Sequence, residues 1–211
     1  MSRNGVLVRA DGVSKSFGPQ QALAPLDLEL RRGETIGLVG ANGAGKSTLI
    51  SVLARALSPS AGRVEWADGI HVGWVPQRPA QYALLSAREN LELFARLEGA
   101  PDPPAAAEEL LDRFDLPPDG RPSGRLSVGN RQRLNVAIAL LGRPDALLLD
   151  EPTASLDPAQ RRRLWAAAGE LRERGAGVLF ATQHLDEAET HADRLIALRD
   201  GRQVAYEGLF E

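Results

Sequence analysis

Gly40-Ala41-Asn42-Gly43-Ala44-Gly45-Lys46-Ser47-Thr48 fits the pattern G-x-x-x-x-G-K-[ST], which is the sequence of a phosphate-binding loop. Residues 34–39, immediately before it, are typical of a short buried strand, and residues 47–57 after it carry apolar side chains at helical spacing. A strand that passes through such a loop into a helix directs backbone N–H groups and the positive helix N-terminus at phosphate oxygens. The segment therefore predicts a nucleotide-binding fold of the α/β class.

The residue types of this loop predict which groups are bound. Lys46 is expected to reach the β- and γ-phosphates, and Ser47 is expected to ligate Mg²⁺. Glycine lets the backbone approach phosphate without a clashing Cβ. The expected ligand is a nucleoside triphosphate with Mg²⁺, and the residues predicted to contact it are Asn42, Gly43, Ala44, Gly45, Lys46, Ser47 and Thr48.

Composition limits the other classes of function. The chain has 211 residues, no cysteine and a formal net charge of −3. Lack of cysteine excludes disulfides, zinc thiolate sites and cysteine nucleophiles, and the charge gives no overall basic field for nucleic acid, so we expect no nucleic acid partner. Residues 1–5 carry no signal-peptide pattern, and the longest apolar stretch, near Val136–Leu141, is far too short to cross a bilayer. We expect no direct membrane insertion.

Hydrophobic periodicity divides the chain into an α/β core interrupted by helices. Strands are predicted at 6–17, 26–30, 63–66, 71–75, 146–150, 177–182, 194–198 and 202–206. Between Tyr82 and Phe114 the pattern is helical, with a capping box at Ser86-Ala87-Arg88-Glu89. Ser127 and Asp157 are predicted N-caps of two further helices. We predict one domain over 1–211, with its core at 1–78 and 123–211, including an antiparallel β subdomain, and a helical subdomain at about 79–122.

Two acidic residues follow the predicted strand at 146–150. Asp150 at the strand end can hold Mg²⁺ opposite Ser47, and Glu151 can polarise a water for attack on the γ-phosphate. The alternative is a pair of solvated acids, which the phosphate-binding loop makes less favourable. Phe17 either stacks on an adenine ring or packs at a strand end, and the residues alone favour neither interpretation.

The order of motifs resembles the nucleotide-binding subunit of an ATP-binding cassette (ABC) transporter, over nearly all 211 residues. Its most specific marker is Leu126-Ser127-Val128-Gly129-Asn130, which is similar to the family signature Leu-Ser-Gly-Gly-Gln. The other matches, in the family's order, are Gln77, Leu147–Asp150 with Glu151, Ser155-Leu156-Asp157 and His184. The resemblance implies a P-loop NTPase (RecA-like) core with an antiparallel β subdomain and an inserted α-helical subdomain, and it implies that the nucleotide is ATP.

The resemblance also implies roles within one subunit. Phe17 matches the position that stacks on adenine, and Gln77 matches the residue that touches Mg²⁺ and the attacking water. Glu151 resembles the catalytic base, and His184 resembles the switch residue that contacts the γ-phosphate. Together with Lys46 of the loop, Gln77, Glu151 and His184 form the expected catalytic set, and Ser47, Gln77 and Asp150 form the expected metal site.

Other implied roles need a second copy of the chain. Ser127 and the N–H of Gly129 are expected to contact ATP held by the partner, in a head-to-tail homodimer that forms with ATP. Asp157 is expected at the dimer seam. Isolated chains are therefore predicted to hydrolyse ATP weakly.

Three positions depart from the family pattern. Val128 stands where the first glycine of the signature usually lies, and Asn130 stands for a glutamine one methylene longer. Gln183 precedes His184, so that motif reads Thr-Gln-His. Since no catalytic group is lost, we expect function to be retained, with altered affinity or partner coupling. His71 and His191 match nothing in the family and are interpreted as structural or surface residues.

The segment 84–91 resembles subunits that serve compact exporter permeases, including haem- and drug-exporter-like groups. Leu84, Leu85 and Phe94 either line a groove for a cytoplasmic helix of an integral membrane permease or pack the helical subdomain. The expected function is ATP hydrolysis that drives transport, with export preferred, at the inner face of the cell membrane. The alternatives are a soluble ABC ATPase acting on ribosomes or DNA, another P-loop kinase or GTPase, and a non-catalytic ATP clamp.

Overall fold

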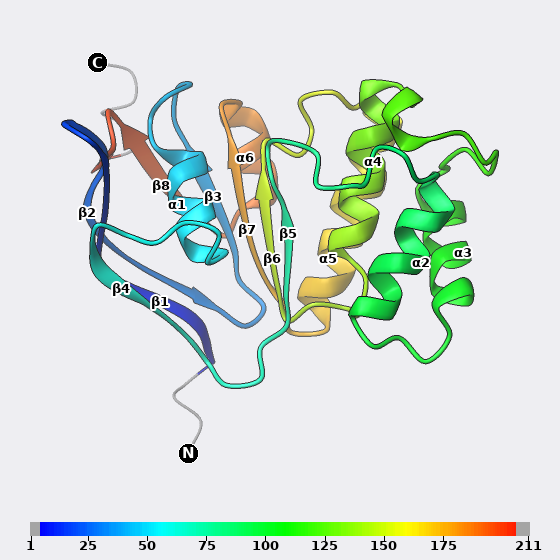
Figure 1. Cartoon of the computed structure of the whole chain (residues 1–211). Coiled ribbons are helices and arrows are strands. Elements are labelled where there is room, and N and C mark those ends of the chain that lie inside the picture. The colour runs from blue at the N-terminus through cyan, green and yellow to red at the C-terminus, as the bar shows by residue number, and fades with distance from the viewer. Residues whose placement is uncertain (1–4, 206–211) are drawn as a thin grey trace.

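A six-stranded sheet forms the centre of the molecule in the computed structural model, which describes residues 5–205 (Figure 1). Its strand order is β5-β6-β7-β3-β8-β9, parallel except for the β8–β9 hairpin. The strands are β3 (Thr35–Val39), β5 (Val72–Val75), β6 (Ala146–Asp150), β7 (Gly177–Thr182), β8 (Arg194–Arg199) and β9 (Arg202–Val204). β3, β6 and β7 are buried along their whole length, which explains their unbroken apolar sequences.

A smaller antiparallel sheet packs over one face of this centre. Its strand order is β2-β1-β4, with β1 at Val6–Phe17, β2 at Gln20–Arg31 and β4 at Ala61–Trp66. Helix α1 (Lys46–Leu53) contacts both sheets, and Leu49, Ile50 and Leu53 are fully buried in the apolar core between them. This core fixes the helix that begins at the end of the phosphate-binding loop.

Helices cover the opposite face and extend beyond the sheet (Figure 1). α5 (Pro158–Glu173) packs Leu164, Ala167 and Leu171 into a second apolar core with β7. The chain between β5 and β6 forms α2 (Ala87–Leu97), α3 (Pro103–Arg113), the short 3₁₀ helix η1 (Ser123–Arg125) and α4 (Val128–Ala139). α2 and α3 pack on each other, and α2 contacts α4, so the helical insert is joined to the core through α4. Among residues 5–205, none of the helices combines the length and hydrophobicity needed to cross a bilayer.

The predicted helix caps are confirmed. Ser86 Oγ accepts a hydrogen bond from the N–H of Glu89 at 3.2 Å, and the Glu89 carboxylate accepts from the N–H of Ser86 at 2.8 Å. Asp157 caps α5 with Pro158 in its first turn, and Ser127 caps α4. The predicted fold class is also confirmed, whereas the subdomain boundaries near 79 and 122 stay a prediction.

Several boundaries differ from the predictions. The helix predicted over 47–57 ends at Leu53, because Arg55 takes a left-handed conformation (φ 59°) and the N–H groups of Ala56 and Leu57 turn back to Ser51 O. β2 begins at residue 20 rather than 26, since it pairs with β1 along the whole hairpin. The short helix α6 (Leu185–His191) was not predicted. The last strand was predicted to end at residue 206, which lies outside the described residues.

Candidate active site

The phosphate-binding loop leaves the carboxyl end of β3, which lies between β7 and β8 in the sheet. Gly45 is the N-cap of α1 with φ 99°, a conformation that L side chains rarely adopt. A Cβ there would also lie 2.7 Å from Ala22 O, in β2. The loop therefore needs glycine at this position both for its turn and for its close contact with the small sheet.

Lys46 is a buried cation inside the loop. Its side chain is 5% exposed, and Nζ donates hydrogen bonds to Gly40 O at 2.6 Å and Ala41 O at 3.1 Å. The same Nζ lies 3.4 Å from Glu151 Oε1. Since buried ammonium groups need compensating partners, these contacts hold the charge where the loop backbone surrounds it.

Ser47 and Asp150 form the second polar contact of the site. Ser47 Oγ donates to Asp150 Oδ1 at 3.0 Å, joining the start of α1 to the end of β6. Burial raises the pKa of Asp150 above its usual value; the Ser47 hydrogen bond opposes this shift and the nearby Glu151 charge adds to it. A hydroxyl and a carboxylate are the oxygen ligands that Mg²⁺ prefers, so this pair fits the expected cation.

Glu151 lies in an uncommon backbone conformation. Its φ is 50°, and its N–H donates to Ala181 O at 3.1 Å. Oε1 is buried and accepts no hydrogen bond, although it is close to Lys46. Residues held at positive φ cost conformational energy and cluster at functional sites. The carboxylate is thus held beside Lys46 by an ion pair rather than by a hydrogen bond to Oε1.

A cavity of about 550 Å³ opens above the loop. All seven loop residues predicted to contact the nucleotide line it, together with Gln77 and Glu151. Its remaining walls are Gln20, Gln21 and Ala22 at the start of β2, and Asp200 and Gly201 in the β8–β9 turn. These five residues were not predicted as site residues, because they belong to no sequence motif and lie near the loop only in the folded structure.

Phe17 lies beside this cavity rather than in its wall. Its side chain is about half exposed at the end of β1, where it pairs with Gln20 of the lining. Lys15 Nζ lies 5.2 Å from the ring centroid, a cation–π contact. The Phe17 ring thus remains accessible near the cavity. Its contact with adenine stays a prediction.

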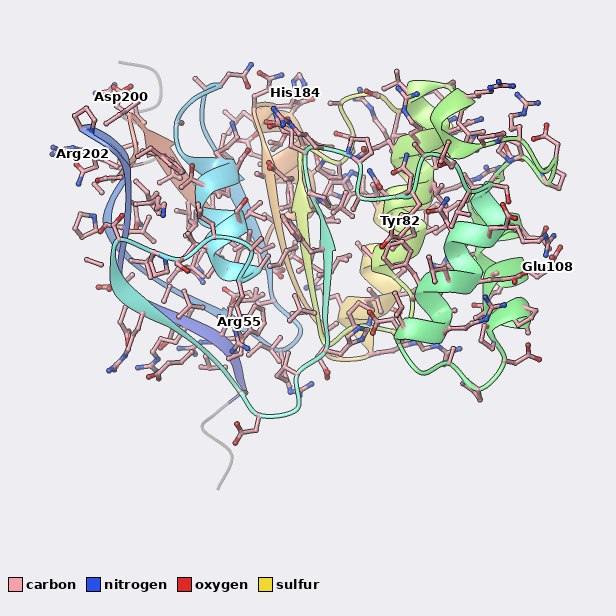
Figure 2. The ribbon with its side chains drawn as sticks, viewed as in Figure 1. Arg55, Tyr82, Glu108, His184, Asp200 and Arg202 are labelled. Atoms are coloured by element: carbon pink, nitrogen blue, oxygen red, sulfur yellow. The ribbon has the colours of Figure 1, made fainter. Side chains whose placement is uncertain are left out.

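A second cavity of about 350 Å³ shares Asn42, Gln77 and Glu151 with the first. It also brings together residues from the start of α4, the segment before α5 and the end of β7, which are Val128, Arg131, Gln132, Ala154, Ser155 and Gln183. Gln183 lines this cavity, whereas His184 has an exposed side chain and its N–H donates to Thr182 Oγ1 at 3.0 Å. Figure 2 shows His184 and Asp200 at the same edge of the molecule.

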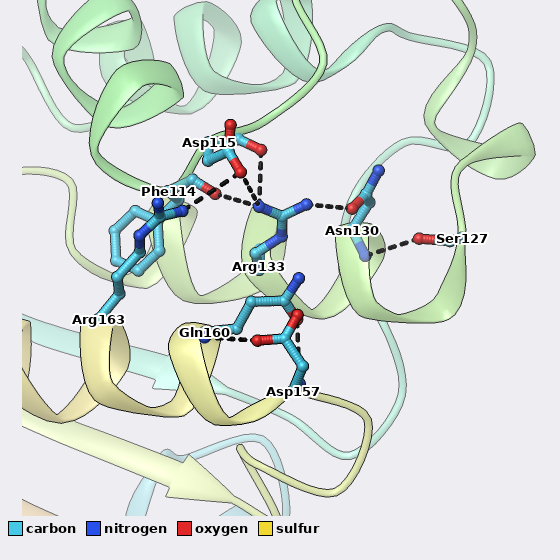
Figure 3. A network of polar contacts seen from close by, with 8 residues as sticks. All are labelled: Phe114, Asp115, Ser127, Asn130, Arg133, Asp157, Gln160 and Arg163. Carbon is cyan, nitrogen blue, oxygen red and sulfur yellow. Dashed lines mark hydrogen bonds and ion pairs between the residues drawn. The ribbon is translucent and has the colours of Figure 1, made fainter.

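The first turn of α4, residues 127–130, is here named the signature turn. Ser127 is exposed, and its Oγ accepts from the N–H of Asn130 at 3.2 Å (Figure 3). Neither Ser127 nor Gly129 lines the cavity above the phosphate-binding loop of the same chain. The signature turn therefore presents a helix N-terminus to the outside of the subunit.

Two histidines outside the site have structural contacts. His71 Nε2 lies 2.8 Å from Glu98 Oε2, on the helical insert. His191 stacks on Trp165, with centroids 4.1 Å apart and planes 13° from parallel, and burial lowers its pKa. Both contacts join neighbouring elements of the fold.

Comparison with known proteins gives consistent matches. Residues 23–154 match the family described as ABC transporter. The chain is 42% identical to daunorubicin resistance ATP-binding protein DrrA3 of Streptomyces coeruleorubidus, over 94% of this chain and 67% of that protein. It is 36% identical to the probable multidrug ABC transporter ATP-binding protein YbhF of Escherichia coli, over 97% of this chain and 38% of that protein.

Solved structures share the fold. An ATP-binding subunit of an ABC transporter superposes with a TM-score of 0.85 at 30% identity, covering 94% of this chain and 88% of that chain. The dimeric bacterial ABC transporter cassette MJ0796 superposes with a TM-score of 0.86 at 26% identity, covering 94% and 97%.

Proposed function

The chain belongs to the ABC transporter family, and from that membership we propose that it binds MgATP and hydrolyses it to drive export through a separate membrane permease. The observation that carries this proposal is a pair of contacts beside the phosphate-binding loop, Ser47 with Asp150 and Lys46 with Glu151. Ser47, Lys46 and Glu151 line the first cavity, and Asp150 lines the second, which also contains Glu151. These contacts support the assignment of Lys46 as phosphate ligand, of Ser47 and Asp150 as cation ligands and of Glu151 as the acidic group beside them. That is the set of groups that phosphoryl transfer to water requires.

In this mechanism the loop backbone and Lys46 bind the β- and γ-phosphates, exchanging part of the contacts that Lys46 makes with Gly40 and Ala41. Ser47, Asp150 and Gln77 are the residues that would hold Mg²⁺, which neutralises charge on the phosphates when bound. Glu151, which lines both cavities, orients the attacking water and accepts its proton. His184 approaches the γ-phosphate from the end of β7.

A second copy completes each site in the proposed mechanism. Ser127 is exposed, and neither Ser127 nor Gly129 lines the cavity above the loop of the same chain, so the helix N-terminus of the signature turn is assigned to contact with ATP on another subunit. A relative of the same fold is a dimer in its solved structure. Asp157, at the start of α5, is assigned to the seam, and ATP favours the closed dimer because it binds that state more tightly.

The proposed membrane partner docks on the helical insert. Tyr82 and Leu84, just before α2, are 55% and 89% exposed, whereas Phe94 packs against the core and Leu85 is half-buried. We assign Tyr82 (Figure 2) and Leu84 to contact with a cytoplasmic helix of the permease, which places the subunit at the inner face of the cell membrane. Relatives named for drug resistance favour this proposal over a soluble ABC ATPase that acts on ribosomes or DNA.

The first test uses a Glu151→Gln protein. It is expected to bind ATP, to hydrolyse it about 10²–10⁴-fold more slowly, the contribution typical of a positioned acid–base group, and to accumulate as a dimer in light scattering. Lys46→Ala is the control that is expected to lose ATP binding. A Glu151→Gln protein that stays monomeric at saturating ATP would refute the dimeric mechanism.

The second test identifies the partner. Affinity purification of Glu151→Gln from native membranes in mild detergent with ATP is expected to recover an integral membrane protein at a stoichiometric ratio. Leu84→Asp is expected to lose that partner while keeping ATP-driven dimerisation. Leu97→Asp, at a residue that is 69% exposed at the C-terminal end of α2, serves as control. Ribosomal or DNA-bound partners instead of a membrane protein would favour the soluble ABC class.

A further inference from the structure

Arg133 is a charged side chain buried where three helices meet (Figure 3). It lies on α4 with its side chain 8% exposed. Nη1 donates to Phe114 O at 2.7 Å and to Asp115 O at 2.6 Å, and these two residues directly follow the last residue of α3. Nε is buried without a hydrogen-bond partner, so the guanidinium is held through Nη1 and Nη2 alone, and Nη1 ties α4 to the end of α3.

The other side of the same guanidinium reaches the signature turn. Nη2 of Arg133 donates to Asn130 Oδ1, one helical turn earlier. Asn130 is therefore held at two points, because its N–H is also bound by Ser127 Oγ. Three consecutive contacts thus run from Ser127 through Asn130 and Arg133 to the end of α3.

A third helix closes the cluster. Asp115 Oδ2 lies 3.3 Å from Arg163 Nη1 of α5 and 3.3 Å from Arg133 Nη1. The hydrogen bond from Arg163, with the charge of Arg133, holds the pKa of Asp115 below its usual value. The Asp115 carboxylate is thus a shared anion between α4 and α5.

The signature turn also touches the segment before α5 directly. A Cβ at Gly129 would lie 3.1 Å from Ser155 O and 3.5 Å from Gln160 Oε1. Gln160 is part of the capping box with Asp157 that begins α5. Glycine at position 129 therefore has a packing reason within the subunit, because a larger residue would push the signature turn away from α5.

We propose that Arg133 is a positioning residue, which uses Asn130 to set the orientation of the signature turn according to where the end of α3 lies. A displacement of the helical insert then moves Phe114 and Asp115, and the guanidinium carries that movement into the turn that meets ATP on the second subunit. The inference rests on the proposed dimeric function. It assigns no contact between Arg133 and ATP.

Asn130→Ala separates this role from a merely structural one. It removes the link to the signature turn but leaves Arg133 bound to Phe114 and Asp115. In a Glu151→Gln background, we expect ATP binding by monomers to be unchanged and the ATP concentration for half-maximal dimer formation to rise about tenfold, as for loss of one hydrogen bond to a charged group. Asn130→Gln, which keeps an acceptor, is expected to recover most of the effect.

Arg113→Gln provides the matched control. Arg113 pairs with Glu170 at 2.8 Å, so it joins the end of α3 to α5 rather than to the signature turn. It is expected to dimerise like the parent protein. Arg133→Lys, which keeps the charge but loses the planar fork, is expected to behave like Asn130→Ala if the protein remains folded by circular dichroism.

The outcomes are distinct. If the Glu151→Gln parent fails to dimerise with ATP, the proposed function and this inference both fail. If the parent dimerises and Asn130→Ala dimerises at the same ATP concentration, the inference alone is overturned. An equal loss of monomer ATP binding in Asn130→Ala would also overturn it, since that result indicates general damage to the subunit.

Discussion

Gly73→Ala tests whether β5 is held against the end of α4 by close backbone contact. A Cβ at Gly73 would lie 2.1 Å from Ala139 O, the last residue of α4, and 3.0 Å from Pro144 Cγ. Ordinary contact begins at 3.4 Å, so β5 and α4 would have to separate by about 1.3 Å at this point. Neither atom belongs to a flexible side-chain end, so the strain cannot be relieved by a rotamer change.

We expect this single methyl group to lower the free energy of unfolding by about 3 kcal/mol, the upper part of the range for overpacking a rigid core. The ATPase rate is expected to fall as well. β5 ends at Val75, two residues before Gln77, and α4 begins at the signature turn, so a shift between them displaces two parts of the proposed site. Equilibrium unfolding in urea, followed by tryptophan fluorescence and circular dichroism together, measures the first effect.

Gly169→Ala is the matched control, because the same substitution is expected here to raise the free energy of unfolding rather than lower it. Gly169 lies in the interior of α5, where a Cβ meets nothing within 4 Å. Alanine there is expected to raise the free energy of unfolding by about 0.5–1 kcal/mol, because glycine loses more conformational freedom in a helix. If Gly73→Ala is as stable as the parent while Gly169→Ala shows its gain, the contact between β5 and α4 does not constrain the fold as argued.

Three further outcomes can be measured. Ser47→Ala removes the hydrogen bond that orients Asp150, so the Mg²⁺ concentration for half-maximal ATPase activity is expected to rise about tenfold; an unchanged Mg²⁺ dependence would contradict this role. His191 has a lowered pKa in the folded protein, so the unfolded chain takes up its proton first and stability is expected to fall as the pH drops below about 6.5. His191→Phe keeps a ring stacked on Trp165, so its melting temperature is expected to fall less between pH 7.5 and 5.5 than that of the parent protein. An equal fall in both proteins would exclude His191 as a source of the pH dependence. Ser86→Ala is expected to cost about 1 kcal/mol in urea unfolding through loss of the capping box, whereas no change would mean that packing alone fixes the start of α2.

Signals confined to a few neighbouring residues predicted local structure correctly. The capping box at Ser86 and the cap with proline at Asp157-Pro158 lie within one helical turn, so sequence alone specifies the hydrogen bonds. The phosphate-binding loop is equally local, because strand, loop and helix follow one another directly. The sequence predicts Ser47 and Asp150 on opposite sides of a bound Mg²⁺; in the structure they lie within direct hydrogen-bond distance, although they are 103 positions apart.

The opposite wall of the cavity could not be predicted in this way. Gln20 and Gln21 are ordinary polar residues at a hairpin, and Asp200 lies in a tight turn, so nothing in their sequence context marks a binding site. They reach the loop only because the small sheet folds over β3 and the β8–β9 hairpin pairs beside it. Helix α6 was missed for a related reason, since seven residues give too short a pattern to recognise.

The central place of β3 in the sheet has a consequence for the newly made chain. Its partners β7 and β8 come late in the sequence, and Thr35 pairs with Val178, 143 positions further on. Such distant pairing is slow to form, and an unpaired apolar strand on a ribosome-bound chain is prone to aggregate. The phosphate-binding loop is therefore synthesised well before the strands that flank β3. Nucleotide that binds only the fully paired sheet would then stabilise correctly folded molecules at a late stage of folding.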